Sequence, residues 1–259
     1  MVIADRFKSR PGAETVRLPS GGEMTLAVEH AAAILVNEQT AFRVVCTPEL
    51  LPQLALGRLL TEGWITCADE VEQIAVCAEG LKISVHLTHP LTARSAAAQE
   101  VSSCCTDNIT LGSPVELQPL RGAPQLEIPD EWVETLAAAM GDELPLYRAT
   151  HAVHSCFVLR DGKILYQCED LGRHNALDKA VGCALAEGVQ LGQCVLYTSG
   201  RVPVDMVRKA IRAGVPALVS KTMPTVQSLE LAEAYGLKLL IRKKKSFHAA
   251  ATKVRECSD

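Results

Sequence analysis

The sequence concentrates polar side chains in the segment 169–179, which reads EDLGRHNALDK. Acids, bases, a histidine and an amide stand here just before apolar residues with helical spacing. The first N–H groups of a helix lack partners and lie at the positive end of its dipole, so a helix start that carries Arg173 is suited to binding an anion. Gly172 lets the backbone approach such a ligand closely. Because arginine binds phosphate through two parallel hydrogen bonds, the segment predicts a phosphate-binding site.

Two further polar clusters, Thr198–Arg201 and Ser220–Pro224, have the same setting. Each follows a short apolar run and precedes a segment with helical spacing. Ligands of open α/β sheets bind at the carboxyl ends of strands, so three such clusters together predict a phosphate-bearing ligand such as a nucleotide. The predicted binding residues are Gly172, Arg173, His174, Asn175, Asp178, Lys179, Ser199, Gly200, Arg201, Ser220 and Lys221.

Each of these clusters has a simpler alternative. A single Ser-Gly-Arg is common in turns that have no binding role, and Asp178 and Lys179 are also compatible with a solvated helix face. The basic run Arg242, Lys243, Lys244 and Lys245 either adds phosphate contacts or is a solvated segment that keeps the edge of a sheet from pairing with another strand.

The elements that position the clusters follow from the pattern after residue 130. Asp161-Gly162 separates two apolar runs and predicts a hairpin. Beyond it, helices are expected at 173–187, 203–213 and 225–235, and strands at 194–198, 217–220 and 237–241. This alternation predicts a mostly parallel sheet covered by helices, with the hairpin as an antiparallel edge.

The first half of the chain predicts a smaller α+β unit. Two apolar runs between Met24 and Val45 join near Asn37-Glu38, and 71–77 pairs with 81–87 in a second hairpin. Thr47-Pro48 predicts the start of a helix that ends at Gly63. The irregular stretch 89–130 predicts a domain boundary, so we expect an N-terminal α+β domain at 1–125 and a C-terminal αβα domain at 126–259. The fold class is therefore α/β, and α+β overall.

Length, composition and charge narrow the classes of protein to which this chain could belong. The chain has 259 residues and 48% hydrophobic content, enough for a sizeable core. Its formal net charge of −4 argues against a nucleic-acid coat protein. No run approaches the roughly 18 apolar residues of a membrane span, and no secretion signal is recognisable, so a cytoplasmic protein without nucleic-acid or membrane partners is expected.

The ten cysteines fall into different settings. None forms a CxxC, so zinc ribbons and thioredoxin-like sites are excluded, and six lie in apolar runs where cysteine acts as a small hydrophobe. Cys104 and Cys105 instead stand in a polar loop, where a stabilised thiolate can act as nucleophile or sulfur carrier. His151 and His154 have no partner pair at metal-ligand spacing, and the signature of zinc deaminases is absent, so no metal site is predicted.

In combination these motifs resemble the FdhD/NarQ family. The segment 169–179 is nearly that family's E-D-[VL]-G-R-H-N-A-[VL]-D-K, and Ser199-Gly200-Arg201 matches its S-G-R. Further matches are Ala213-Gly214-Val215-Pro216, the run LELAEAYG ending at Gly236, and Thr47-Pro48 with the segments LALG and TEG that follow. The resemblance spans roughly residues 23–247.

The resemblance implies a sulfur carrier with a cysteine persulfide. It implies sulfur transfer from a cysteine desulfurase to bis-molybdopterin guanine dinucleotide, the molybdenum cofactor of formate dehydrogenase or another molybdoenzyme. It further implies a C-terminal domain similar to cytidine deaminase without its zinc, and a homodimer. GDP is then an expected mimic of the nucleotide ends of the cofactor.

The chain departs from the family pattern in its cysteine loop. Where the family has S-S-C-G-x-C-G, this chain keeps Cys104 but has Cys105 for the glycine and Asp107 for the second cysteine. Cys104 is the expected carrier and Cys105 a candidate helper. The alternative is a divergent cofactor-binding paralogue or chaperone that has lost sulfur transfer.

Overall fold

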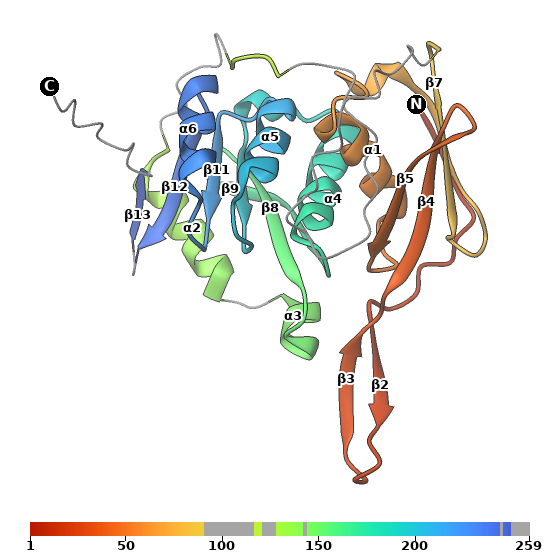
Figure 1. Ribbon diagram of the computed structural model, residues 1–259. Helices are drawn as coiled ribbons and strands as arrows, with labels where there is room; N and C mark the ends of the chain where they lie inside the picture. Colours follow the sequence, from red (N-terminus) through yellow and green to blue (C-terminus); the bar gives the residue numbers. More distant parts are fainter. Residues whose placement is uncertain (91–116, 121–127, 142–143, 244–245, 250–259) are drawn as a thin grey trace, which may run out of the picture.

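The computed structural model describes the chain apart from residues 91–116, 121–127, 142–143, 244–245 and 250–259 (Figure 1). Its first half forms a five-stranded mixed sheet with two antiparallel hairpins and two parallel pairings. In spatial order the strands are β1 (Val2–Asp5), β6 (Val71–Val76), β7 (Lys82–Leu87), β4 (His30–Val36) and β5 (Gln39–Cys46). The two hairpins predicted from the sequence, β4–β5 and β6–β7, are confirmed.

The second half forms a six-stranded sheet. β10, β11 and β12 are parallel, and β8 joins β10 in the antiparallel sense. In spatial order the strands are β13 (Ser246–Ala249), β12 (Lys238–Lys243), β11 (Ala217–Ser220), β10 (Val195–Thr198), β8 (His154–Arg160) and β9 (Lys163–Asp170). Because β9 is antiparallel to β8, it runs in the same direction as β10. The predicted parallel sheet with an antiparallel hairpin at its edge is therefore confirmed.

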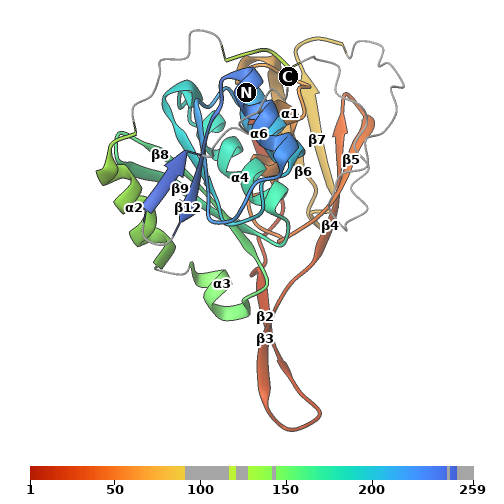
Figure 2. The ribbon, with the colours of Figure 1, turned by 60° about the vertical axis from the view of Figure 1, so that its left-hand side comes forward.

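Helices cover both faces of this sheet. They are α2 (Asp130–Gly141), α4 (Arg173–Ala186), α5 (Val204–Arg212) and α6 (Val226–Tyr235), with the short α3 (Pro145–Thr150) below. Leu136 of α2 packs with Phe157 and Tyr197 on one face. The other face belongs to the larger core, which includes α4, α5 and α6 (Figure 2). The sheet and the helices on its two faces form three layers, and this arrangement explains why the strands carry apolar side chains on both sides.

Helix α1 (Leu51–Thr61) joins the two halves by packing directly on α4, so that both helices lie between the two sheets (Figure 1). A Cβ on Gly57 would lie 1.8 Å from the carbonyl oxygen of Asp178, and one on Gly182 would lie 1.9 Å from that of Gln53. The two backbones therefore touch, and only glycine fits at either position. The two halves share one continuous core across this contact.

Three features differ from the sequence-based expectation or extend it. The strands β2 (Ala13–Arg17) and β3 (Glu23–Ala27) form a separate hairpin that projects from the body (Figure 2). The helix predicted to start at Thr47-Pro48 begins at Leu51, because the Thr47 side chain is buried among partners in the second half. The predicted domain boundary at 125/126 lies outside the described residues. Among those that are described, no helix is both long and apolar enough to cross a membrane.

Candidate functional site

The predicted polar clusters do meet at one edge of the six-stranded sheet. Since β9, β10 and β11 run in the same direction, their carboxyl ends lie together, and each leads through a short loop into α4, α5 or α6. The start of β8 reaches the same edge between β9 and β10, which places His154 among these loops. The strand ends therefore provide the geometry that the sequence predicted.

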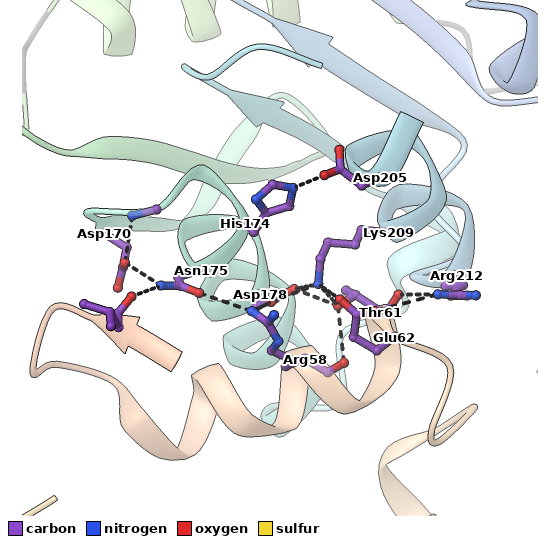
Figure 3. Close-up of polar contacts among 12 residues, drawn as sticks. Arg58, Thr61, Glu62, Asp170, His174, Asn175, Asp178, Asp205, Lys209 and Arg212 are labelled. Carbon is purple, nitrogen blue, oxygen red and sulfur yellow. Dashed lines mark hydrogen bonds and ion pairs between the residues drawn. The ribbon is translucent and has the colours of Figure 1, made fainter. Parts of the chain in front are cut away.

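Asp170 shapes the first of these loops. Its Oδ1 accepts hydrogen bonds from the backbone N–H of Gly172 at 3.0 Å and from Asn175 Nδ2 at 2.9 Å, so the chain turns into α4 (Figure 3). Its Oδ2 accepts from the Thr47 N–H at 3.0 Å and lies 2.6 Å from Lys179 Nζ. Lys179 also donates to the Thr47 hydroxyl at 2.6 Å. One buried aspartate thus fixes the loop, the helix start and the segment before α1.

A second buried network joins α1, α4 and α5 around Asp178. Lys209 donates to both carboxylate oxygens at 2.9 and 3.0 Å, and the Thr61 hydroxyl donates at 2.6 Å (Figure 3). Arg58 Nη1 lies 3.4 Å from Asp178 Oδ2, and Lys209 Nζ also lies 2.7 Å from Glu62 Oε1. Although burial opposes ionisation of Glu62, these cations hold its pKa at about 2. Charges buried this deeply persist only when they are paired in this way.

The structure therefore changes the interpretation of half the central motif. Asn175, Asp178 and Lys179 are at most 1% exposed, and their polar atoms are bonded to other parts of the chain. They position the loop and join the two halves instead of facing a ligand at the surface. The sequence contains a signal for this role: Arg58 and Thr61 are polar residues three apart in a helix that is apolar apart from Gln53.

The second loop contributes exposed groups. Arg201 is exposed and Ser199 is partly exposed beside His154. Ser199 Oγ accepts the Ser155 N–H at 2.8 Å and lies 3.4 Å from His154 Nδ1. A Cβ on Gly200 would meet Arg173 Cβ at 2.7 Å, so this glycine makes room for the arginine stem.

The field at this edge is positive. The pKa of His154 lies below its usual 6.5, first because the ring is partly buried, and then because Arg173, His174 and Arg201 are close. The nearby Asp170 opposes the shift without reversing it. His174 lies 2.9 Å from Asp205 of α5, which ties the start of α4 to the next helix (Figure 3). A neutral histidine surrounded by cations suits an edge that binds anions.

The third loop adds one more exposed cation. Ser220 is buried and its hydroxyl donates to the Gly200 carbonyl at 3.2 Å, as does that of Thr222 at 2.8 Å. These bonds hold the second and third loops together. Lys221, in contrast, is exposed beside them. Ser220 therefore organises the edge, and Lys221 is placed to reach a ligand.

The remaining predicted residues are only partly covered by the structure. Arg242 and Lys243 form the end of β12, whose parallel direction brings this end to the same edge. Lys244, Lys245, Cys104 and Cys105 lie outside the described residues. Among the residues that are described, no three His, Cys, Asp or Glu side chains are grouped to hold a metal ion.

Comparison with known proteins places this architecture in a family. The model of the FdhD/NarQ family matches residues 27–250. A sulfur carrier protein FdhD from Nocardia farcinica is 32% identical over 87% of this chain and 86% of its own length. The Bacillus subtilis protein of that name is 28% identical over 83% of each chain.

A solved structure agrees with this placement. The crystal structure assigned as a formate dehydrogenase accessory protein from Desulfotalea psychrophila shares 27% identity, with a TM-score of 0.66. The alignment covers 93% of this chain and 96% of the other. The family match extends over the whole six-stranded sheet, the three loops at its edge and every strand of the five-stranded sheet except β1, and so the chain belongs to the FdhD/NarQ family.

Proposed function

We propose that the protein is a sulfur carrier that takes sulfur from a cysteine desulfurase and passes it to bis-molybdopterin guanine dinucleotide for formate dehydrogenase. Support comes from the family match, from relatives named sulfur carrier protein FdhD, and from the formate dehydrogenase accessory protein of similar fold. The likeness of the C-terminal domain to cytidine deaminase is part of the same proposal. In this view the molybdenum cofactor is the substrate, and the protein's own groups bind and position it.

The observation that carries the proposal is the cationic edge formed by Arg173, Arg201 and Lys221. Arg201 and Lys221 are exposed on adjacent loops, whereas Arg173 is buried behind Gly200 near His154, where it adds positive charge beneath them. Cations from neighbouring loops suit the diphosphate of a guanine nucleotide, which carries several acceptor oxygens. The buried bonds of Asp170 and Ser220 keep the loops in place before the ligand arrives.

In the proposed reaction, the cationic edge holds the nucleotide end of the cofactor while Cys104 carries the sulfur. The Cys104 thiolate attacks the outer sulfur of the desulfurase persulfide, so a new S–S bond forms on Cys104 and the desulfurase thiolate leaves. The outer sulfur on Cys104 is the atom handed on to the cofactor; its bond to the Cys104 sulfur breaks in this step, and Cys104 leaves as a thiolate. Cys105 is proposed as a helper of this loop.

Nucleotide binding is tested by calorimetry with GDP on single variants. Loss of a hydrogen bond to a charged group costs about 1.5–3 kcal/mol, so Arg201→Ala and Lys221→Ala should each weaken binding by roughly tenfold or more. Lys163→Ala is the matched control, because Lys163 is an exposed lysine at the opposite end of β9. Equal GDP affinity in all four proteins would place the nucleotide elsewhere.

Sulfur loading is tested separately by mass spectrometry after treatment with a cysteine desulfurase and cysteine. Persulfide should form on Cys104 and disappear in Cys104→Ala. Cys67→Ala is the control, because Cys67 is also an exposed thiol. Loading that is unchanged in Cys104→Ala would refute the carrier assignment.

The second candidate is a divergent paralogue or chaperone that binds the cofactor without transferring sulfur. It is favoured by Asp107, which stands where the family pattern has its second cysteine. It predicts wild-type GDP binding with no persulfide on any cysteine. The proposed homodimer is checked in the same preparations by light scattering.

A further inference from the structure

A pair of thiols lies on β9 and α4, the two elements joined by the first loop of the cationic edge. The sulfur atoms of Cys168 on β9 and Cys183 on α4 are 3.9 Å apart. A disulfide requires about 2.05 Å between sulfur atoms, so the two side chains must turn toward each other for a bond to form. The two cysteines are 15 positions apart in the sequence, and the contact arises only because α4 folds back along β9.

The backbone around the pair is already held in place by a neighbouring contact. Asp170, two residues beyond Cys168 on β9, pairs with Lys179, which lies one helical turn before Cys183. Residues two apart on a strand share a face, as do residues four apart on a helix. The ion pair and the thiol pair therefore join the same two elements side by side, and a bond between the sulfurs preserves their spacing.

The two thiols differ in access and in acidity. Cys183 is partly exposed, whereas Cys168 is only 3% exposed. The hydrogen bond between the two sulfurs lowers the pKa of Cys183; burial and the charge of Glu187 oppose this shift, and Lys179 supports it. The same hydrogen bond, together with burial, raises the pKa of Cys168. Cys183 thus has the features of an attacking thiol, and Cys168 those of an internal resolving thiol.

We propose that Cys168 and Cys183 form a redox-active dithiol that a low-molecular-weight disulfide closes into an internal disulfide. The Cys183 thiolate attacks the small disulfide, forms a mixed disulfide and releases one small thiolate. Cys168 then loses its proton and attacks the Cys183 sulfur, which releases the second small thiolate. The protein loses two hydrogens, and the small disulfide is reduced to two thiols. The product is a covalent tie between β9 and α4 at the base of the cationic edge.

The nearby thiols provide internal controls. Cys156 is the cross-strand partner of Cys168 on β8, yet it is completely buried, and burial raises its pKa. Cys194 is also buried, its Sγ lies 3.5 Å from the Gln190 carbonyl oxygen, and burial raises its pKa to about 11. Neither combines access with acidity as Cys183 does, so the expected linkage is specific.

The test is peptide mapping of the folded full-length protein after incubation with oxidised glutathione and alkylation of the remaining thiols. The expected product is a peptide pair linked through Cys168 and Cys183. Cys168→Ser should trap glutathione on Cys183, whereas Cys156→Ser should leave the linked pair intact. Dithiothreitol should reverse the link.

The proposal is overturned by several results on the wild-type protein, which do not depend on whether a variant folds. These are a link from Cys183 to Cys194, a link from Cys156 to Cys168, a stable glutathione adduct on Cys183 with Cys168 still free, or no reaction at Cys183. Mapping reads the linkage directly, so adducts on Cys104 and Cys105 do not affect the answer. GDP binding is not part of the readout, so the outcome is independent of the proposed sulfur transfer.

Discussion

Replacing Lys179 by methionine is the sharpest test of the buried network. Methionine keeps an unbranched stem but removes the ammonium group, which lies 2.6 Å from both Asp170 Oδ2 and Thr47 Oγ1. Removing one partner of a buried ion pair costs about 3–5 kcal/mol, because the other charge is left without compensation. Asp170 keeps hydrogen bonds from Thr47, Gly172 and Asn175, so we expect the lower end, about 3 kcal/mol.

Urea unfolding followed by circular dichroism measures this loss. With an m-value of about 2–3 kcal/mol/M, the midpoint should fall by roughly 1 M urea at constant slope. Lys163→Met is the matched control and should change stability by less than about 0.5 kcal/mol, because Lys163 is exposed. In a double-mutant cycle, Asp170→Asn should cost less on the Lys179→Met background than on wild type. A loss below about 1 kcal/mol for Lys179→Met would show that the ammonium group, which contacts both Asp170 and Thr47, is not a main source of stability.

Three further predictions concern the same interface and edge. Because the folded-state pKa of Glu62 is about 2, below its usual 4.5, its contribution to stability is present above about pH 4.5 and is lost as the pH falls toward 2. Over that pH range the free energy of unfolding should therefore fall by up to about 3 kcal/mol more in wild type than in Glu62→Gln. An equal fall in both proteins would contradict the low pKa of Glu62. Gly57→Ala should cost about 2–3 kcal/mol in urea unfolding, because the new methyl group meets helix backbone, while Gly192→Ala has an ordinary 3.8 Å neighbour and should be nearly neutral. GDP affinity should decline with added salt, and calorimetry should give a shallower decline in Arg201→Ala; identical slopes would count against a role for that charge.

The sequence predicted the elements best where apolar periodicity was regular. The alternation after Asp161-Gly162 gave each later helix of the second half within one or two residues. The β2–β3 hairpin was not predicted, because its strands are mostly exposed and so have no apolar face to repeat at every second residue. The start of α1 was misplaced because Thr47 has the residue type of a helix cap but serves Asp170 and Lys179.

The sequence predicted where the site lies, but not which of its residues are buried in the structure and which are exposed to a ligand. Strand order brings the three loops together, and that follows from alternating strands and helices. The burial of Asp178 and Lys179 depends on α1 and on Thr47 just before it, which come from far earlier in the chain. A motif read within one segment cannot show which of its charges meet partners more than a hundred residues away.

The glycine contact between α1 and α4 limits how this protein can be divided. Asp178 of α4 pairs with Arg58 and accepts a hydrogen bond from Thr61, both in the first half, and the backbones of α1 and α4 are in direct contact. A fragment of the second half alone would expose unpaired charges together with a large apolar surface. The two halves should therefore be expressed together as one chain. In chimeras between relatives, the junctions should lie within the strands and loops of one half, so that α1 and α4 come from the same parent.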